Sequence, residues 1–152
     1  MNLNKILNQP FTFARRSQLI PGELRPIWKV SLILLIFGIL AKSNKCSLKK
    51  LHIANWVTKS EDHIDELKTW STNTTAIRPD IRIEPSLDRA IELMVGDNLL
   101  IKTNGKLEVT KLGLELFKRL DEADVLKVEK DSLLAVKKIM TEANVERIFK
   151  VA

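Results

Sequence analysis

The sequence contains few of the side chains on which enzyme catalysis most often depends. Its 152 residues include one cysteine, two histidines and no tyrosine, and it shows neither a glycine-rich phosphate loop nor a metal-binding spacing. The nearest approaches to a site are the acidic run at residues 61–66 and the pair His52 and Asn55. The acidic run is better explained by helix capping and a solvated helix face than by metal binding. His52 and Asn55 are better explained by a polar contact than by a general base. We therefore expect no catalytic activity, no metal and no cofactor.

The sequence also has few features of a secreted or membrane-spanning protein. Cys46 is the single cysteine and excludes an internal disulfide, and the first residues lack the apolar core of a signal peptide. The most apolar stretch, residues 24–41, has lysines near both ends and is shorter than the roughly 20 apolar residues that span a bilayer. We expect a cytoplasmic protein without membrane contact, in which this stretch is a buried helix.

Positive charge is concentrated in the first part of the chain. The net charge is +6, but residues 1–59 contain ten Lys or Arg and one Glu, a net +9, whereas residues 60–152 contain fifteen basic and eighteen acidic residues, a net −3. Basic patches attract polyanions. The candidate nucleic-acid contacts are Lys42, Lys45, Lys49 and Lys50 near one helix start, and Lys102 and Lys106 on an expected hairpin. Ordinary solvation explains the first four equally well, and charge that blunts an exposed strand edge explains the last two better.

The stretch at residues 24–41 predicts the central helix. Apolar side chains surround nearly the whole helix, so it must be buried nearly all round. Ser31, Gly38 and Lys42 share one narrow stripe, and the two small residues would allow another segment to approach closely. The sequence leaves open whether that segment belongs to this chain or to a partner.

Helix caps are predicted where a serine, threonine or aspartate stands before a helical pattern. These residues are Ser47, Ser60, Thr110, Thr141 and either Asp131 or Ser132. The corresponding helices are expected at about 48–59, 61–70 and 111–120 and, in one or two pieces, through the tail after residue 121.

Residues 81–110 are predicted to form a strand, a helix and a hairpin. The alternation at residues 81–84 favours a short strand, and Pro85 opens a helix that runs to about Gly96. This helix is expected to bury Leu87, Ala90, Ile91, Leu93 and Met94 and to expose Asp88, Arg89 and Glu92. Apolar runs then flank Asn104-Gly105, which is the strongest short signal for a β-hairpin.

The first 22 residues are interpreted as an arm. They contain Pro10, Pro21 and Gly22 and no sustained period, yet they also carry large apolar side chains. Such a segment either lies along a partner and orders on docking or folds back on its own domain, and the residues favour neither. Large apolar side chains in excess of a small core are the candidate partner contacts: Phe11, Phe13, Leu19, Trp28 and Trp56.

The element order and the segment MVGDNLLIKTNGKLEVTKLGLELFKRL resemble the winged-helix family, with a helix end, a two-stranded wing and a Thr-x-x-Gly that opens a further helix. The resemblance implies a mainly α fold with a small β-hairpin (α+β). It places a winged helix-turn-helix at residues 23–122, between the arm at 1–22 and a C-terminal helical extension at 123–152. Winged helices bind DNA, RNA and proteins alike. Because Asp88 and Glu92 on the expected recognition helix would repel phosphates, sequence-specific DNA reading is disfavoured.

A second resemblance covers about residues 20–120. The pattern Leu24-Arg25-Pro26-x-Trp28, the apolar helix, and Lys45-x-Ser47-Leu48-x-x-Leu51-His52-x-x-Asn55-Trp56 resemble the small middle components of bacterial ABC three-component systems, including Lamassu-type anti-phage systems. This resemblance implies a non-enzymatic adaptor in a hetero-oligomer with an SMC-like ATPase and an effector, commonly a nuclease. ATP, metal and nuclease chemistry would belong to those partners, and nucleic-acid binding by the chain itself is expected to be weak and non-specific. The alternative function is a small, dimeric DNA-binding transcriptional regulator.

Overall fold

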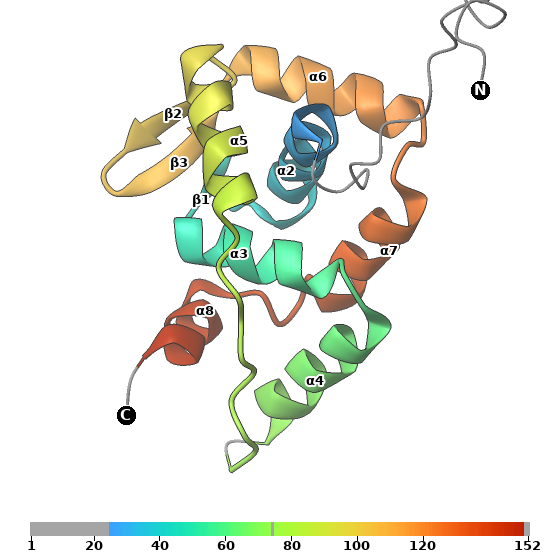
Figure 1. Ribbon diagram of the computed structural model, residues 1–152, viewed down its shortest axis with the longest axis vertical. Coiled ribbons are helices and arrows are strands. Elements are labelled where there is room, and N and C mark those ends of the chain that lie inside the picture. The colour runs from blue at the N-terminus through green and yellow to red at the C-terminus, as the bar shows by residue number, and fades with distance from the viewer. Residues whose placement is uncertain (1–24, 74, 151–152) are drawn as a thin grey trace, which may run out of the picture.

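The computed structural model describes residues 25–73 and 75–150, so the arm at 1–22, with Phe11, Phe13 and Leu19, lies outside the described residues. Within these ranges the protein is mainly helical with a small antiparallel sheet (Figure 1), which confirms the α+β class. The helices are α2 (Pro26–Leu40), α3 (Leu48–Val57), α4 (Glu61–Thr72), α5 (Pro85–Gly96), α6 (Lys111–Glu122), α7 (Lys127–Val136) and α8 (Glu142–Phe149). The strands are β1 (Lys45–Cys46), β2 (Leu100–Thr103) and β3 (Lys106–Val109).

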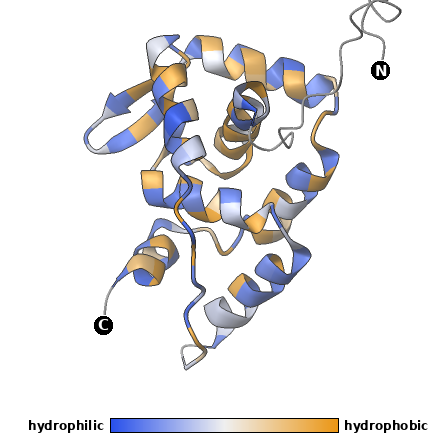
Figure 2. Ribbon diagram, viewed as in Figure 1, coloured by the Kyte–Doolittle hydropathy of each residue, from blue (hydrophilic) through white to orange (hydrophobic). Residues whose placement is uncertain are grey.

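Helix α2 is the centre of the core, as its sequence predicts. Leu32, Ile33, Leu35 and Ile36 are each 0% exposed. Helices α3, α5, α6 and α7 all pack against α2, and its ribbon is apolar along most of its length (Figure 2). Within the described ranges, no helix combines the length and the apolar character that crossing a membrane requires.

The small residues of α2 accommodate a neighbour from the same chain. A Cβ at Gly38 would lie 2.1 Å from Cε2 of Phe117 in α6, so the aromatic ring occupies the space that a side chain would take. Ser31, on the same stripe, donates its hydroxyl hydrogen bond to the carbonyl of Ile27 (2.8 Å). The close neighbour that the sequence left open is therefore α6.

Four predicted helix caps are confirmed. The hydroxyl oxygens that accept backbone N–H bonds from the first turns of α3, α4, α6 and α8 belong to Ser47, Ser60, Thr110 and Thr141. Each bond satisfies an N–H group that has no partner within its own helix. These four helix starts are thus set by local hydrogen bonding.

The cap predicted at Asp131 or Ser132 is wrong, because α7 begins earlier, at Lys127. Its N-cap residue is Leu126, which has a left-handed backbone (φ 54°) and makes no side-chain cap. Ser132 lies inside the helix and donates its hydroxyl hydrogen bond to the carbonyl of Val128 (3.0 Å). Helix α7 packs against α2 and α4, and no side-chain cap marks its start.

The segment predicted as a C-terminal extension is part of the main core. Leu133 and Val136 of α7 and Val145 and Ile148 of α8 belong to the same cluster of buried residues as α2. Helix α7 packs against α2, α3 and α4, and α8 packs against α3. These contacts bury the apolar surface of α3 that exceeds the needs of a three-helix core.

The strand predicted at residues 81–84 is wrong. These residues form no strand, and the third strand of the described sheet is β1, which pairs antiparallel with β3 and places Lys45 opposite Glu108. The strand order is β1-β3-β2. An alternation over only four residues is a weak signal for a strand. The last of these residues, Glu84, is instead the N-cap residue of α5, and its carboxylate pairs with Lys29 and Lys59.

The hairpin predicted around Asn104-Gly105 is confirmed. Strands β2 and β3 pair antiparallel, and Thr103 lies opposite Lys106 across the turn. Asn104 and Gly105 both have positive φ, at 49° and 77°. Two successive positive φ values are the pattern of a type I′ turn, whose twist matches that of the paired strands.

Replacing Gly105 with valine is expected to lower the free energy of unfolding by about 1 kcal/mol or more, because a β-branched residue tolerates positive φ poorly. Among the described residues, no heavy atom lies within 4 Å of the Cβ position, so the cost arises from the backbone and not from a clash. Lys102→Ala and Lys106→Ala on the same hairpin are the controls and should change stability by less than about 0.5 kcal/mol. Urea unfolding measures all three, and a Gly105→Val chain as stable as the parent would contradict the turn assignment.

Candidate interaction surface

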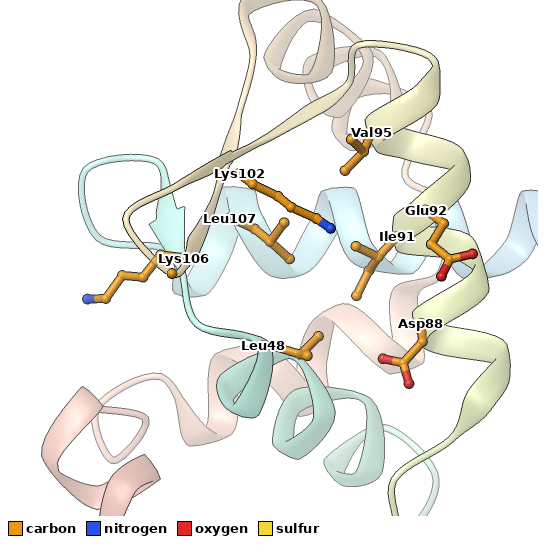
Figure 3. Close-up of a pocket in the computed structure, with 9 residues that line it drawn as sticks. Leu48, Asp88, Ile91, Glu92, Val95, Lys102, Lys106 and Leu107 are labelled. Atoms are coloured by element: carbon orange, nitrogen blue, oxygen red, sulfur yellow. The ribbon is translucent and has the colours of Figure 1, made fainter.

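A groove lies between α5, the hairpin and the start of α3 (Figure 3). Its volume is about 540 Å³. Its apolar lining residues are Leu48, Ile91, Val95 and Leu107. Asp88 and Glu92 stand on the α5 side, Lys102 extends from the hairpin toward α5, and Lys106 points away from the groove. The groove thus combines an apolar floor with an acidic wall and a basic wall.

The acidic wall follows from how α5 packs. Helix α5 contacts α2 and β2, and its fully or nearly buried residues are Leu87, Ala90, Ile91 and Met94. Glu92 is exposed, as its sequence position predicts. The expectation that Leu93 is buried is wrong, since it is 48% exposed. At 100° per residue, Leu93 falls roughly 60° beyond Ala90 on the helix circumference and so misses the buried arc.

Asp88 is held in place by a buried histidine. Nε2 of His52 lies 3.0 Å from Oδ1 of Asp88, and the two side chains are 4% and 44% exposed. Nδ1 of His52 is buried without a hydrogen-bond partner among the described residues. The polar contact expected of His52 is therefore made to α5, and it fixes the acidic wall relative to α3.

A buried polar network, which the sequence did not predict, joins α2, α3 and the start of α5. Lys29 is 1% exposed, and its ammonium donates to Oδ1 of Asn55 (2.7 Å) and to Oε2 of Glu84 (3.0 Å). Nδ2 of Asn55 donates to the same carboxylate oxygen (3.1 Å). Lys59 pairs with the other oxygen of Glu84. The available signal was a lysine inside an otherwise apolar, buried helix, which requires polar partners.

The structure separates the six candidate nucleic-acid contacts. Lys50 is 4% exposed, so the expectation that it lies on a basic surface is wrong. Helix α8 packs against α3, and its Glu142 accepts a hydrogen bond from Ser47 at the start of that helix. There Lys49 pairs with Glu146 (Nζ to Oε2, 3.2 Å), and Lys45 is partly buried in β1. The candidates that remain exposed are Lys42, Lys49, Lys102 and Lys106, and of these Lys49 is the one paired with Glu146.

The two tryptophans proposed as partner contacts have different surroundings. Trp56 is 6% exposed and stacks on His63 of α4, with ring centroids 4.1 Å apart. The expectation that Trp56 lies outside the core is therefore wrong, because α4 and α8 cover α3. Trp28 is partly buried and lines a second groove, of about 290 Å³, with Ile27 and Val125. Ile27 is 74% exposed there, so the surface around Trp28 is accessible.

Cys46 is a buried residue of the sheet and not a reactive thiol. It is 0% exposed, and burial raises the pKa of its thiol from 9.0 to about 12, against an opposing effect of the positive charge of Lys50. The thiolate is the nucleophilic form of cysteine. Complete burial and the raised pKa both disfavour a role for Cys46 as a nucleophile or a metal ligand.

The same shift predicts a loss of stability at alkaline pH. Because the pKa of Cys46 is raised in the folded state, the folded chain keeps a proton that the unfolded chain loses above pH 9. This contribution is complete below pH 9 and is lost between pH 9 and about pH 12, at about 1.4 kcal/mol per pH unit. Urea unfolding below and above pH 9 should show a smaller alkaline loss in Cys46→Ala than in the parent. Equal losses in both chains would contradict the prediction.

Comparisons with protein-family models, with curated proteins and with solved structures found no match for this chain.

Proposed function

We propose that the chain is a winged-helix protein that binds other proteins, and that it acts as a non-enzymatic accessory subunit of an anti-phage complex, joining an SMC-like ATPase to an effector nuclease. The winged-helix assignment is supported by the element order α2, β1, α3, α5, β2, β3, with α4 inserted before α5. It is also supported by the small antiparallel sheet in the order β1-β3-β2. In this assignment α5 is the helix that enters the major groove in DNA-binding relatives.

The apolar groove beside α5 is the observation that carries the protein-binding role. Its floor includes Leu48, which is 44% exposed although it is a large aliphatic side chain. Burying such a surface against a partner is favourable by about 25 cal/mol per Å². The exposed carboxylates of Glu92 on α5 and of its C-cap residue Asp97 would instead face the phosphates of a nucleic acid and repel them. The surface therefore suits a protein better than DNA.

Membership of a defence complex is supported by the sequence resemblance over residues 20–120. It is tested by co-expressing the chain with the proteins encoded by adjacent genes, followed by affinity purification and size-exclusion chromatography. We expect the chain to co-elute with an ATPase and an effector in one hetero-oligomer. A chain that remains alone, as a stable homodimer, would contradict the proposal and favour the transcriptional regulator.

Deleting residues 1–20 is expected to abolish this co-purification. Phe11, Phe13 and Leu19 are candidate contacts, and large side chains at the centre of an interface typically contribute about 2 kcal/mol or more each. The deletion removes none of the described residues, and circular dichroism checks that the helices persist. A complex that survives the deletion would exclude the arm from the partner surface.

DNA binding by the isolated chain is a further test of the proposed function. We expect weak, sequence-independent binding that falls steeply as salt is raised, because it would depend on counterion release. Fluorescence anisotropy with short duplexes measures it. Lys102→Gln with Lys106→Gln should weaken it more than the matched change at the exposed Lys137 and Lys138, at the C-terminal end of α7. Tight binding to one particular sequence at physiological salt would favour the regulator instead.

A further inference from the structure

The groove beside α5 has opposite charges on its two sides. On α5, Asp88 and Glu92 are one helical turn apart and form a short acidic row, and Asp88 keeps 44% of its side chain exposed beside His52. On the hairpin, the exposed Lys102 extends toward α5, whereas the exposed Lys106 points away from the groove. A ligand that spans the groove therefore meets negative charge along one flank and positive charge along the other.

Apolar side chains from α3, α5 and β3 form the floor of the groove. Leu48 of α3 is 44% exposed and Val95 of α5 is partly exposed, and they offer the accessible apolar surface of the floor. Ile91 and Leu107, each 5% exposed, form its bottom. Lys102 of β2 and Leu107 of β3 are cross-strand partners and both line the groove, so the sheet meets the groove with one of its faces and not with a strand edge. A ligand that lies here must satisfy its own backbone hydrogen bonds, and an α-helix does so.

From these features we infer that the groove binds an amphipathic helix of a partner protein. The helix places an aliphatic stripe, spaced i, i+3, i+4 and i+7, on the floor. Its flank toward Asp88 and Glu92 carries lysine or arginine, and its flank toward Lys102 carries glutamate or aspartate. The inference rests on the proposed protein-binding function and adds the chemistry of the partner segment. Charge complementarity of this kind favours one partner and disfavours helices with a single sign of charge.

Three designed peptides of about 14 residues, roughly four helical turns, test the inference. They share one leucine stripe and differ in their flanks, which are lysine on one side with glutamate on the other, lysine on both sides, or glutamate on both sides. Fluorescence anisotropy with the full chain should show that the mixed peptide binds about tenfold more tightly than either of the others. Equal binding of the three peptides would overturn the inference.

Two charge reversals at exposed positions make the test specific. Glu92→Lys adds positive charge to the α5 wall, opposite the unchanged Lys102 on the hairpin, so the preference should move to the peptide with glutamate on both flanks. In Lys102→Glu the preference should move to the peptide with lysine on both flanks. Glu115→Lys makes the same charge change on the exposed surface of α6 and should leave the preference unchanged. Preferences that do not move in the two groove variants would also overturn the inference.

A floor variant separates this inference from the proposed function. Leu48→Glu puts a charge on the apolar floor, and a carboxylate is compatible with the first turn of α3. It should weaken all three peptides and the complex with the partner proteins. A partner complex that persists in Leu48→Glu would overturn the inference and leave the proposed function standing. Selective binding of the mixed peptide by a chain that forms no protein complex would support the groove chemistry and contradict the proposed function.

Discussion

Replacing Lys29 with methionine is expected to lower the free energy of unfolding by about 3 kcal/mol, since removing one partner of a buried ion pair leaves the other groups without compensation. The ammonium is buried and bonded to both Asn55 and Glu84. Methionine has a similar length and is apolar, so it fits the surroundings of α2 but donates no hydrogen bond. Asn55 and Glu84 would therefore each lose a hydrogen-bond donor, and Glu84 would keep Lys59 as a partner.

The matched control is Lys42→Met, which makes the same change at an exposed position. It should alter stability by less than about 0.5 kcal/mol. Urea unfolding followed by circular dichroism measures both variants. Because Glu84 is the N-cap residue of α5, Lys29→Met should also weaken peptide binding in the groove, whose acidic wall α5 provides. A stability loss below about 1 kcal/mol would mean that Lys29 reaches water and that the network contributes little.

Structure that depends on a few neighbouring residues could be predicted from the sequence. The caps at Ser47 and Thr110 each involve a hydroxyl and an N–H three residues later. The hairpin turn depends on Asn104 and Gly105 alone, because both adopt positive φ. The central position of α2 was equally clear, since a helix that is apolar on all sides has to be surrounded.

Features that join distant residues could not be predicted. Lys29 binds residues that are 26 and 55 positions away, and β1 finds its partner strand more than sixty positions later. A two-residue strand has no periodicity of its own, whereas the four alternating residues at 81–84 have a period and no partner strand. Local pattern therefore placed the third strand in the wrong segment.

The candidate site was predicted in its parts and not in its arrangement. The sequence identified Asp88 and Glu92 as exposed acids and Lys102 and Lys106 as exposed bases, but as unrelated surface features. Their position on two sides of one groove depends on how α5 packs against α2 and β2. The expectation for Trp56 was wrong for a related reason, because the covering of α3 by the distant helix α8 has no local signal, although the stacking partner His63 is only 7 positions away.

The second large effect concerns Gly113, the glycine of the Thr-x-x-Gly pattern. It lies in the first turn of α6, where its N–H donates to Oγ1 of Thr110 (3.2 Å). A Cβ at this position would lie 2.7 Å from the carbonyl oxygen of Leu99 and 2.6 Å from Cγ2 of Val109. The Leu99 carbonyl cannot move away freely, because it accepts the backbone N–H of Thr110 (3.0 Å). The pattern thus requires glycine where α6 meets the start of the hairpin.

Gly113→Ala is therefore expected to lower the free energy of unfolding by about 2 kcal/mol, as overpacking against backbone outweighs the gain in helix propensity of up to about 1 kcal/mol. Gly96→Ala is the matched control, also in a helix, because no heavy atom of the described residues lies within 4 Å of its Cβ position. That variant should be neutral or slightly more stable than the parent. Urea unfolding of both chains gives the comparison. Two alanine variants of equal stability would show that α6 can shift away from Leu99, and the close approach would then not explain the glycine.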